Sequence, residues 1–266
     1  QQIHVEKNKG NFMNINNEKG YLYIAYGEAF TKEALMSIES LRRYTDLPIA
    51  LFTDQKLIAE KKSDQLNINL VGEIKANHLR AKVDYMDQSP FQKTVFLDSD
   101  TVIVRNCDDM FELLERFDVA IVDDYARKRE NYSKQVPEYS DIPYAFSEGN
   151  SGVIAFNNSF RTQTFLKMWK EYFYHYFKIT NGWDQVSFRI ALWKSNVRIH
   201  RMPFEYNVRS QANREKQDRF HHEYGEDHMQ SRIIHIHYNS EIHRGIYNIK
   251  SLEELEKIVK EKAVKY

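Results

Sequence analysis

The sequence of 266 residues contains one cysteine, Cys107, and only five prolines and nine glycines. A single cysteine excludes an internal disulfide framework and fits a reducing compartment, where a small apolar role in the core is expected. No apolar run is long enough to span a bilayer, and the polar start at residues 1–14 lacks the apolar core of a signal peptide. We therefore expect a soluble, cytoplasmic chain, either complete or part of a longer protein.

The chain also lacks an excess of either charge, because 38 Lys and Arg residues balance 38 Asp and Glu residues. No global field would attract nucleic acid, so no nucleic-acid partner is expected. The balance also argues against obligatory tight adsorption to a membrane, while peripheral association stays open. What the chain has in quantity is tyrosine, with 17 copies. Tyrosine offers a flat surface with a polar tip, which sugar and base recognition both use, although most tyrosines pack in cores and surfaces.

The chain alternates strand-like and helix-like segments. Residues 1–20 are polar and rich in Asn and Lys, which predicts a flexible N-terminal arm. The run at 21–26 predicts a buried strand, Thr31 predicts a helix N-cap, and residues 47–54 predict a second strand. This order predicts a parallel βαβ unit with a right-handed crossover.

The remaining segments continue this alternation within one α/β domain. Strands are expected where apolar and β-branched residues run together, at 94–97, 101–104, 118–122, 151–157, 196–202 and 232–238. Helices are expected where apolar residues recur at helical spacing, at 76–87, at 110–117 with a capping box of Asp109 and Glu112, at 160–177, at 184–195 and after a cap of Ser251 and Glu254. Polar segments are expected at 125–149, as a functional loop or lid, and at 207–231, where His221, His222 and His228 suggest a solvated loop rather than a second metal site.

Two carboxylates interrupt the apolar run at 91–104. Asp98 and Asp100 stand at the carboxyl end of a predicted strand, where ligands bind in open α/β sheets, and Ser99 between them is small enough for close approach. Burying such a pair without a counter-charge is costly, and oxygen ligands suit a hard cation such as Mg²⁺ or Mn²⁺. An isolated Asp-x-Asp is more often a loop or N-cap pair, but this position favours a metal site that also holds a diphosphate.

Six segments carry a family resemblance. "YIAYGEAFTKEALMSIESLRRY", "IALFTD", "SPFQKTVFLDSDTVIV", "GNSGVIAFN", "DQVSF" and "IIHIHY", in this order, resemble the nucleotide-sugar glycosyltransferases of the A-type fold. The likeness is greatest to the retaining group that contains glycogenin and bacterial lipopolysaccharide galactosyl- and glucosyltransferases, and it covers residues 21–240. It implies a single-domain, Rossmann-like α/β/α sandwich with a mostly parallel sheet. Residues 21–104 would form the nucleotide-binding half and residues 105–266 the sugar and acceptor half of one catalytic domain, 21–266.

The resemblance implies a metal centre built from three side chains. Asp98 and Asp100 match the family's metal-binding pair. The third ligand is the histidine that closes the last strand, and His237 in the step "HY" matches the family pattern better than His235. Both histidines face the same side of a strand, so both remain candidates.

The resemblance also implies which residues surround the donor sugar. Asp123 ends the strand after the metal motif, where the family holds sugar hydroxyls, and Asn150 matches an Asn that contacts the sugar. Asp184 and Gln185 match an Asp-Gln pair beside the reacting carbon. Carboxylates and amides suit this task because they satisfy hydroxyl groups with directional hydrogen bonds. For Asp184, a helix N-cap is the structural alternative.

The first strand ends in the segment that matches the family's nucleotide-binding turn. Ala25, Tyr26 and Gly27 occupy this turn, where Tyr26 could stack on a uracil and Gly27 lets the backbone approach a ligand. Asp54, at the end of the next strand, could bond the base or the ribose. The spaced glycines of a dinucleotide-binding fingerprint are missing.

Basic residues are expected at the diphosphate. Arg80 and Lys82, on the predicted helix before the metal strand, could reach it, or could be surface charges, with Arg80 pairing with Asp84 four residues later. The family's usual lysine near the end of the motif series is absent. His243 or Arg244 could replace it.

Together these features predict a metal-dependent hexosyltransferase that uses a nucleotide-diphosphate sugar, most consistent with a UDP-sugar, in polysaccharide biosynthesis. The acceptor would be a glycan, a glycolipid or a protein. Retention follows from the resemblance, whereas inversion would need a protein base such as Asp123, Asp124 or Asp184. Two alternatives remain open: a sugar nucleotidyltransferase, whose Gly-rich basic loop the segment "YGEAFTKEA" lacks, and a non-catalytic nucleotide-sugar or carbohydrate-binding protein.

Overall fold

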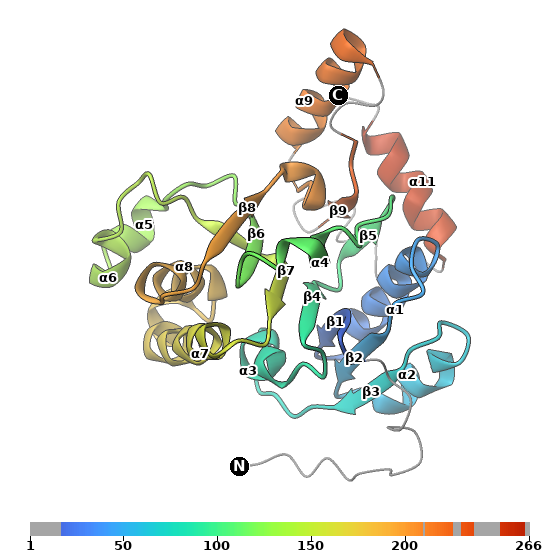
Figure 1. The fold of residues 1–266 in the computed structure, drawn as a ribbon, viewed down its shortest axis with the longest axis horizontal. Helices are drawn as coiled ribbons and strands as arrows, with labels where there is room; N and C mark the ends of the chain where they lie inside the picture. Colours follow the sequence, from blue (N-terminus) through green and yellow to red (C-terminus); the bar gives the residue numbers. More distant parts are fainter. Residues whose placement is uncertain (1–16, 210, 226–229, 237–250, 264–266) are drawn as a thin grey trace.

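A computed structural model of the chain describes residues 17–209, 211–225, 230–236 and 251–263. Seven strands form the central sheet in the order β3-β2-β1-β4-β7-β6-β8 (Figure 1). All paired neighbours are parallel except those of β7, which runs against β4 and β6. The mostly parallel sheet of a single α/β domain is therefore confirmed. The strands are β1 (Lys19–Ala25), β2 (Ile49–Thr53), β3 (Leu70–Glu73), β4 (Lys93–Leu97), β6 (Val119–Asp123), β7 (Gly149–Asn157) and β8 (Ile199–Met202).

Alternation along β1 shows how the three layers form. Tyr21 and Tyr23 pack on one face of the sheet with α1 (Glu28–Arg42), whereas Leu22 and Ile24 belong to a separate core on the opposite face. That second core contains residues of α7 (Phe160–Thr180) and α8 (Asp184–Lys194). Successive strand side chains point to opposite faces, so one buried strand feeds both cores. Figure 1 shows α1 and the pair α7 and α8 on opposite sides of the sheet.

The strand expected at 91–104 is broken at the two carboxylates. β4 ends at Leu97, and β5 (Thr101–Ile103) leaves the main sheet to pair antiparallel with β9 (Ile233–His235). This register sets Thr101 opposite His235. The break therefore places the acidic residues in a turn between two sheets, beside the last described strand.

A helix near the end of the chain covers this small sheet. Leu252 and Leu255 of α11 (Leu252–Ala263) pack with Val102 and Ile236 in a separate cluster. The expected cap is present at this helix, because the Glu254 backbone N–H donates to Ser251 Oγ over 3.3 Å. None of the described helices combines the length and the apolar character that crossing a membrane requires.

The helix expected at 76–87 is wrong in its first half. Residues 76–81 are not helical, and only α3 (Lys82–Tyr85) and one 3₁₀ turn, η2 (Met86–Gln88), follow. Tyr85 explains part of the difference, because its hydroxyl donates to the Lys75 carbonyl and accepts from the Lys75 N–H, which holds the preceding chain in a loop. Leu79, expected on the apolar face, has 64% of its surface exposed.

The first helix also begins earlier than expected, at Glu28, with Gly27 and not Thr31 in the N-cap position. Gly27 has φ +95°, a backbone conformation that favours glycine. Thr31 is buried inside the helix, where its hydroxyl donates to the Gly27 carbonyl and hydrogen-bonds Thr53 Oγ1. The sequence analysis did not predict α2 (Lys56–Ser63) or β3.

Three further expectations need correction in the second half of the chain. The segment 207–231 contains α9 (Gln211–Tyr224), whose polar sequence lacks the apolar stripe on which helix prediction depends. The helix at 110–117 shrinks to α4 (Met110–Leu113), and Asp109 makes no capping bond. The expected loop 125–149 carries two single-turn helices, α5 (Glu130–Ser133) and α6 (Pro137–Ser140). A one-turn helix, η3 (Phe204–Tyr206), follows β8.

The segment 125–148 is anchored to the domain. Val136, Tyr139 and Ile142 form a cluster with Val186 and Ile190 of α8. Burial of such apolar groups stabilises the segment against its neighbour helices. The segment therefore has a defined position next to the N-terminus of α8, where it can contribute to a site.

Candidate functional site

Several chain segments converge at one edge of the sheet. β1, β4 and β6 end there, whereas β7, which runs in the opposite direction, and α8 begin there. This is the edge at which open α/β sheets bind ligands. A cavity of about 320 Å³ lies at this edge, lined by Ile24, Ala25, Tyr26, Phe30, Leu79, Arg80, Lys82, Asp98, Ser99, Asp100, Asn150, Ser151, Gly152, Trp183, Asp184, Gln185, Arg209 and His235.

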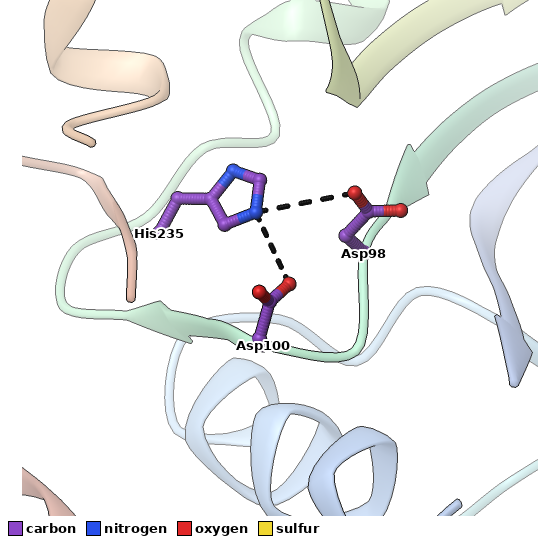
Figure 2. A group of neighbouring side chains, drawn as sticks. All are labelled: Asp98, Asp100 and His235. Atoms are coloured by element: carbon purple, nitrogen blue, oxygen red, sulfur yellow. Dashed lines mark ion pairs between the residues drawn. The ribbon is translucent and has the colours of Figure 1, made fainter. Parts of the chain in front are cut away.

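The acidic pair and one histidine form a compact group in this cavity (Figure 2). His235 Nε2 lies 3.1 Å from Asp100 Oδ1 and 3.9 Å from Asp98 Oδ2. One potential ligand atom from each of the three residues lies within 4.8 Å of the others. Two carboxylates and an imidazole are a donor set that divalent cations accept. The group could therefore hold a metal ion.

The orientation of His235 supports this assignment. Its Nδ1 lies 3.0 Å from Asn207 Oδ1, while Asn207 Nδ2 donates to Asn150 Oδ1 over 2.7 Å. The Asn207 oxygen must then accept, so Nδ1 carries the proton. Nε2 is left to face Asp100, where its lone pair can bind a cation shared with that carboxylate. Hydrogen bonding of the remote nitrogen is the usual way to orient a metal-binding histidine.

The close approach of His235 depends on a glycine. A Cβ atom added to Gly152 would lie 2.2 Å from His235 Cε1 and 2.9 Å from Asp98 Oδ2. No side chain fits at such distances without displacing the ring or the carboxylate. Gly152, in the segment "NSG" at the start of β7, therefore keeps open the space in which the three candidate ligands meet.

The structure also gives Asp98 a counter-charge from the protein itself. Lys82 Nζ lies 3.0 Å from Asp98 Oδ1 and 3.1 Å from Oδ2, and it donates to the carbonyl and the hydroxyl of Ser151. From the sequence alone, only a metal ion was expected in this role. Lys82 is nearly fully buried, so its charge acts where solvent screening is weak.

Asp184 pairs with two cationic side chains, Arg80 and Lys82, beside the pair of Lys82 and Asp98. Its Oδ1 lies 3.2 Å from Arg80 Nε, and its Oδ2 accepts from Ser151 Oγ over 2.7 Å and lies 3.5 Å from Lys82 Nζ. Burial raises the pKa of this carboxyl, but Lys82 and Arg80 outweigh burial and lower the pKa to about 2. The expected pairing of Arg80 with Asp84 is not found. Asp84 instead contacts Tyr174 and Lys170.

A buried carboxylate lies beneath the sugar-binding candidates. Asn150 Nδ2 donates to Asp124 Oδ2 over 3.1 Å, and Gln185 Nε2 lies 3.4 Å from the same oxygen. Arg129 pairs with Asp124 Oδ1 at 3.2 Å, and Arg209 pairs with Oδ2. Asp124, with 1% exposure, thus fixes two lining side chains and two cations.

Asp123 occupies a different place. Its carboxylate contacts Arg127 at 2.7 Å, Arg201 at 3.1 Å and Ser147 Oγ at 2.7 Å. It does not belong to the described residues that line the cavity. The structure therefore does not bring Asp123 together with Asp184 and Gln185, whereas Asp124 lies directly behind them.

Of the residues predicted to bind the nucleotide, some line the cavity and others hold the turn behind it. Ala25 and Tyr26 line the cavity. Gly27 and Asp54 lie behind it, because the Gly27 N–H donates to Asp54 Oδ1 over 2.7 Å and Asp54 Oδ2 accepts from Gln55. Asp54 therefore holds the turn that carries Tyr26.

Three predicted site residues lie outside the described residues, and two residues that support the site were not predicted. His237, His243 and Arg244 lie outside the described residues. Sequence reasoning missed Ser151 and Asn207, which hold Lys82 and His235 in place. Ser151 sits between two matched residues of the segment "NSG", which is the signal that could have found it, whereas nothing in the sequence around Asn207 marks it.

A buried carboxyl behind the acidic turn makes folding pH-dependent. Glu33 of α1 has 2% exposure, accepts from Ser99 Oγ through Oε2, and has no hydrogen-bond partner at Oε1 among the described residues. Burial, with the charges of Asp100 and Asp98, raises its pKa from 4.5 to about 8. The folded state therefore holds this proton at pH values at which the unfolded chain has lost it.

Glu33→Gln is expected to remove this pH dependence. Because the folded state binds the extra proton, wild-type stability falls as pH rises from about 4.5 to about 8. The variant should exceed the wild type in free energy of unfolding at pH 8, on the order of 3 kcal/mol, and match it near pH 4. Urea unfolding with EDTA at both pH values measures the difference. A variant no more stable than the wild type at pH 8 would show that Glu33 is charged in the folded protein.

Comparisons with known proteins agree with this geometry. The glycosyltransferase GlyE of Streptococcus pneumoniae TIGR4 shares the fold, with a TM-score of 0.56 and 16% sequence identity over 94% of this chain and 66% of that chain. The apo form of GlyE gives 0.52 and 16% over 92% of this chain and 64% of that chain. The chain thus spans slightly less than two thirds of the GlyE chains that it matches. A comparison with curated protein sequences finds no match.

The chain shares its α/β fold with these glycosyltransferase structures, which confirms the fold expected from the sequence. The profile of nucleotide-diphospho-sugar transferases matches residues 92–247, more than half of the chain. The chain belongs to the nucleotide-diphospho-sugar transferase family.

Proposed function

We propose that the protein is a metal-dependent glycosyltransferase that moves a hexose from a UDP-sugar to an acceptor with retention of configuration. One observation carries the proposal: the candidate metal ligands Asp98, Asp100 and His235 share a cavity with Asp184 and Gln185. A binding protein would need neither a metal centre nor this pair beside it. A divalent cation such as Mn²⁺ or Mg²⁺ would dock the diphosphate and neutralise the charge that grows on it as the glycosidic bond breaks.

Two cationic side chains would assist the same leaving group. Arg80 and Lys82 line the cavity and are held by Asp184, so their charges are fixed before any substrate arrives. Preorganised charges stabilise a developing anion because no reorganisation is needed during the reaction. Both residues therefore suit the diphosphate, and Asp184 acts by positioning them.

Amide groups would bind the sugar. Asn150 Oδ1 already accepts from Gly152 N and Asn207 Nδ2, while its Nδ2 group donates once among the described residues, to Asp124. An amide nitrogen has two hydrogens, so one remains for a ligand hydroxyl. The Gln185 side chain accepts from the Ser151 N–H and donates to the Gly149 carbonyl, so its role would be to shape the pocket. Tyr26, at the other end of the cavity, would stack on the base.

The stereochemical course can be tested separately. With retention, the leaving phosphate accepts the proton of the acceptor hydroxyl, and no protein base is required. NMR of the product made from a UDP-α-hexose should show an α-glycoside. A β-glycoside would contradict retention and direct attention to a carboxylate base.

The general proposal is tested by UDP release. UDP-glucose, UDP-galactose and their N-acetyl forms are incubated with the protein in Mn²⁺ or in EDTA, with and without glycan, glycolipid and protein acceptors. Release from at least one donor in Mn²⁺, lost in EDTA, is expected. No release from any donor would contradict the proposal.

Comparison of substitutions at the adjacent residues Asp124 and Asp123 tests which carboxylate supports the candidate metal ligands. Asp124 connects through Asn150 and Asn207 to His235, so Asp124→Asn should weaken Mn²⁺ binding and transfer about 10- to 100-fold. Asp123→Asn serves as the matched control, because Asp123 pairs with Arg127 and Arg201 outside the cavity. Isothermal titration and UDP release measure both effects. A larger loss for Asp123→Asn would contradict this assignment and restore Asp123 as the sugar-binding carboxylate.

A further inference from the structure

A second cavity lies beside the first. It has a volume of about 440 Å³ and is lined by Arg129, Glu130, Asn131, Tyr132, Gln135 and Trp183. Trp183 also lines the first cavity, the proposed donor site, and directly precedes Asp184. One indole thus forms a wall common to both cavities. A molecule in the second cavity would lie next to the proposed sugar-binding end of the first.

The walls of the second cavity are fixed by buried charges. Arg129 Cζ lies 4.6 Å from the centre of the Trp183 ring, within the range of a cation–π contact. The same guanidinium pairs with Glu148 at 3.1 Å and with Asp124 at 3.2 Å. Because Asp124 also holds Asn150, the position of Trp183 is tied to the donor site.

The chemistry of the lining favours a carbohydrate. Tyr132 packs edge-on against Trp183 with ring centres 5.8 Å apart, so two aromatic rings supply flat apolar surface. The other lining residues are polar, and among the described residues no hydrogen bond engages the Asn131 side chain, the Tyr132 hydroxyl or Trp183 Nε1. Aromatic surface combined with unpaired amide and hydroxyl groups matches the apolar ring faces and the hydroxyls of a sugar. A lipid chain would leave these polar groups without partners.

We propose that this second cavity binds the sugar unit of the acceptor. The sugar ring would pack against Trp183, and Asn131 and Gln135 would form hydrogen bonds with its hydroxyls. The inference rests on the proposed function, since it supplies the second substrate of the same reaction. It commits to carbohydrate, either as a free glycan or as the headgroup of a glycolipid. Recognition would use the sugar alone, so an alkyl aglycone should add little affinity.

The test uses methyl glycosides of glucose, galactose, N-acetylglucosamine and lactose as acceptors of the full chain. Asn131→Ala combined with Gln135→Ala should raise the acceptor KM at least tenfold, while the KM for the UDP-sugar and the rate of UDP-sugar hydrolysis change less than twofold. Both positions are exposed, so folding should be unaffected. Asp141→Ala, an exposed position in the same segment that does not line the cavity, is the control and should leave every constant unchanged.

Two further arms separate the outcomes. An octyl glycoside and the methyl glycoside of the same sugar should give acceptor KM values within about threefold, and a much lower value for the octyl compound would overturn recognition of the sugar alone. Unchanged acceptor KM in the double variant, or Mn²⁺-dependent hydrolysis without transfer to any glycoside, would also overturn the inference and leave the proposed function intact. Absence of both hydrolysis and donor binding would instead remove the proposed function, and the inference with it.

Discussion

Replacement of Asp100 by Asn is expected to lower sugar transfer on the order of 100- to 1000-fold, because an amide cannot supply the negative charge that a divalent cation needs. Asp100 lies closer to His235 than Asp98 does and has only 7% of its surface exposed. The loss should appear in Mn²⁺ affinity as well as in kcat, measured by titration calorimetry and UDP release.

Asp109→Asn is the matched control for this prediction. Asp100 directly precedes β5, whereas Asp109 follows β5 in the chain and contacts Tyr206 and Arg232 outside the cavity. This variant should retain wild-type Mn²⁺ affinity and activity. Equal UDP release from Asp100→Asn and wild type would show that the acidic turn does not hold the ion.

Replacement of Asp184 by Asn is expected to lower both stability and activity. The carboxylate is the common partner of Arg80 and Lys82, and its removal leaves the buried Lys82 and the partly exposed Arg80 close together without it. Breaking a buried ion pair from one side costs about 3–5 kcal/mol. Because the pKa of Asp184 is lowered to about 2, its stabilising charge is present at neutral pH and would be lost only as pH falls from about 4 to about 2. Donor transfer should fall at least about 100-fold as both cations lose their positions.

Substitution of a second buried carboxylate, outside the site, is the control that distinguishes a loss of stability from a loss of function. Asp118, at the start of β6, has 1% exposure and pairs with Arg198 at 2.9 Å, remote from the described cavity lining. Asp118→Asn should therefore lower the free energy of unfolding, measured in urea, while kcat per folded molecule stays unchanged. If both variants lost activity only in proportion to unfolding, Asp184 would be structural and not a positioning residue of the site.

The sequence predicted the parts of this fold that follow from local pattern. Apolar runs located the strands of the main sheet other than β3, and the order of motifs placed Asp98, Asp100, Asn150 and Asp184 at one edge, where the structure brings them together. For Asp98 and Asp100 this success has a physical basis, since the carboxyl ends of parallel strands meet at one edge whatever the details of packing. Asn150, at the start of the antiparallel strand β7, and Asp184, at the start of α8, were placed by the resemblance.

Features that depend on tertiary contacts could not be predicted. The choice of Asp124 over Asp123 beneath the cavity illustrates this, because the register of β6 with β7 shifts between Ile121 and Asp123 and alternation alone no longer tells which side chain faces the site. The placement of His235 at the acidic turn likewise depends on the pairing of β9 with β5. The loop before α3 contacts Tyr174 and Asp184, which are distant in sequence, and α9 has no apolar stripe, so no local periodicity reveals either element.

The most direct test of the central claim is a crystal structure of the protein with UDP and Mn²⁺, with diffraction data collected at the manganese absorption edge. We expect an anomalous peak bonded to side-chain atoms of Asp98, Asp100 and His235 and to phosphate oxygens of UDP. A peak elsewhere, or well-ordered UDP in the cavity with no manganese at these three side chains, would contradict it.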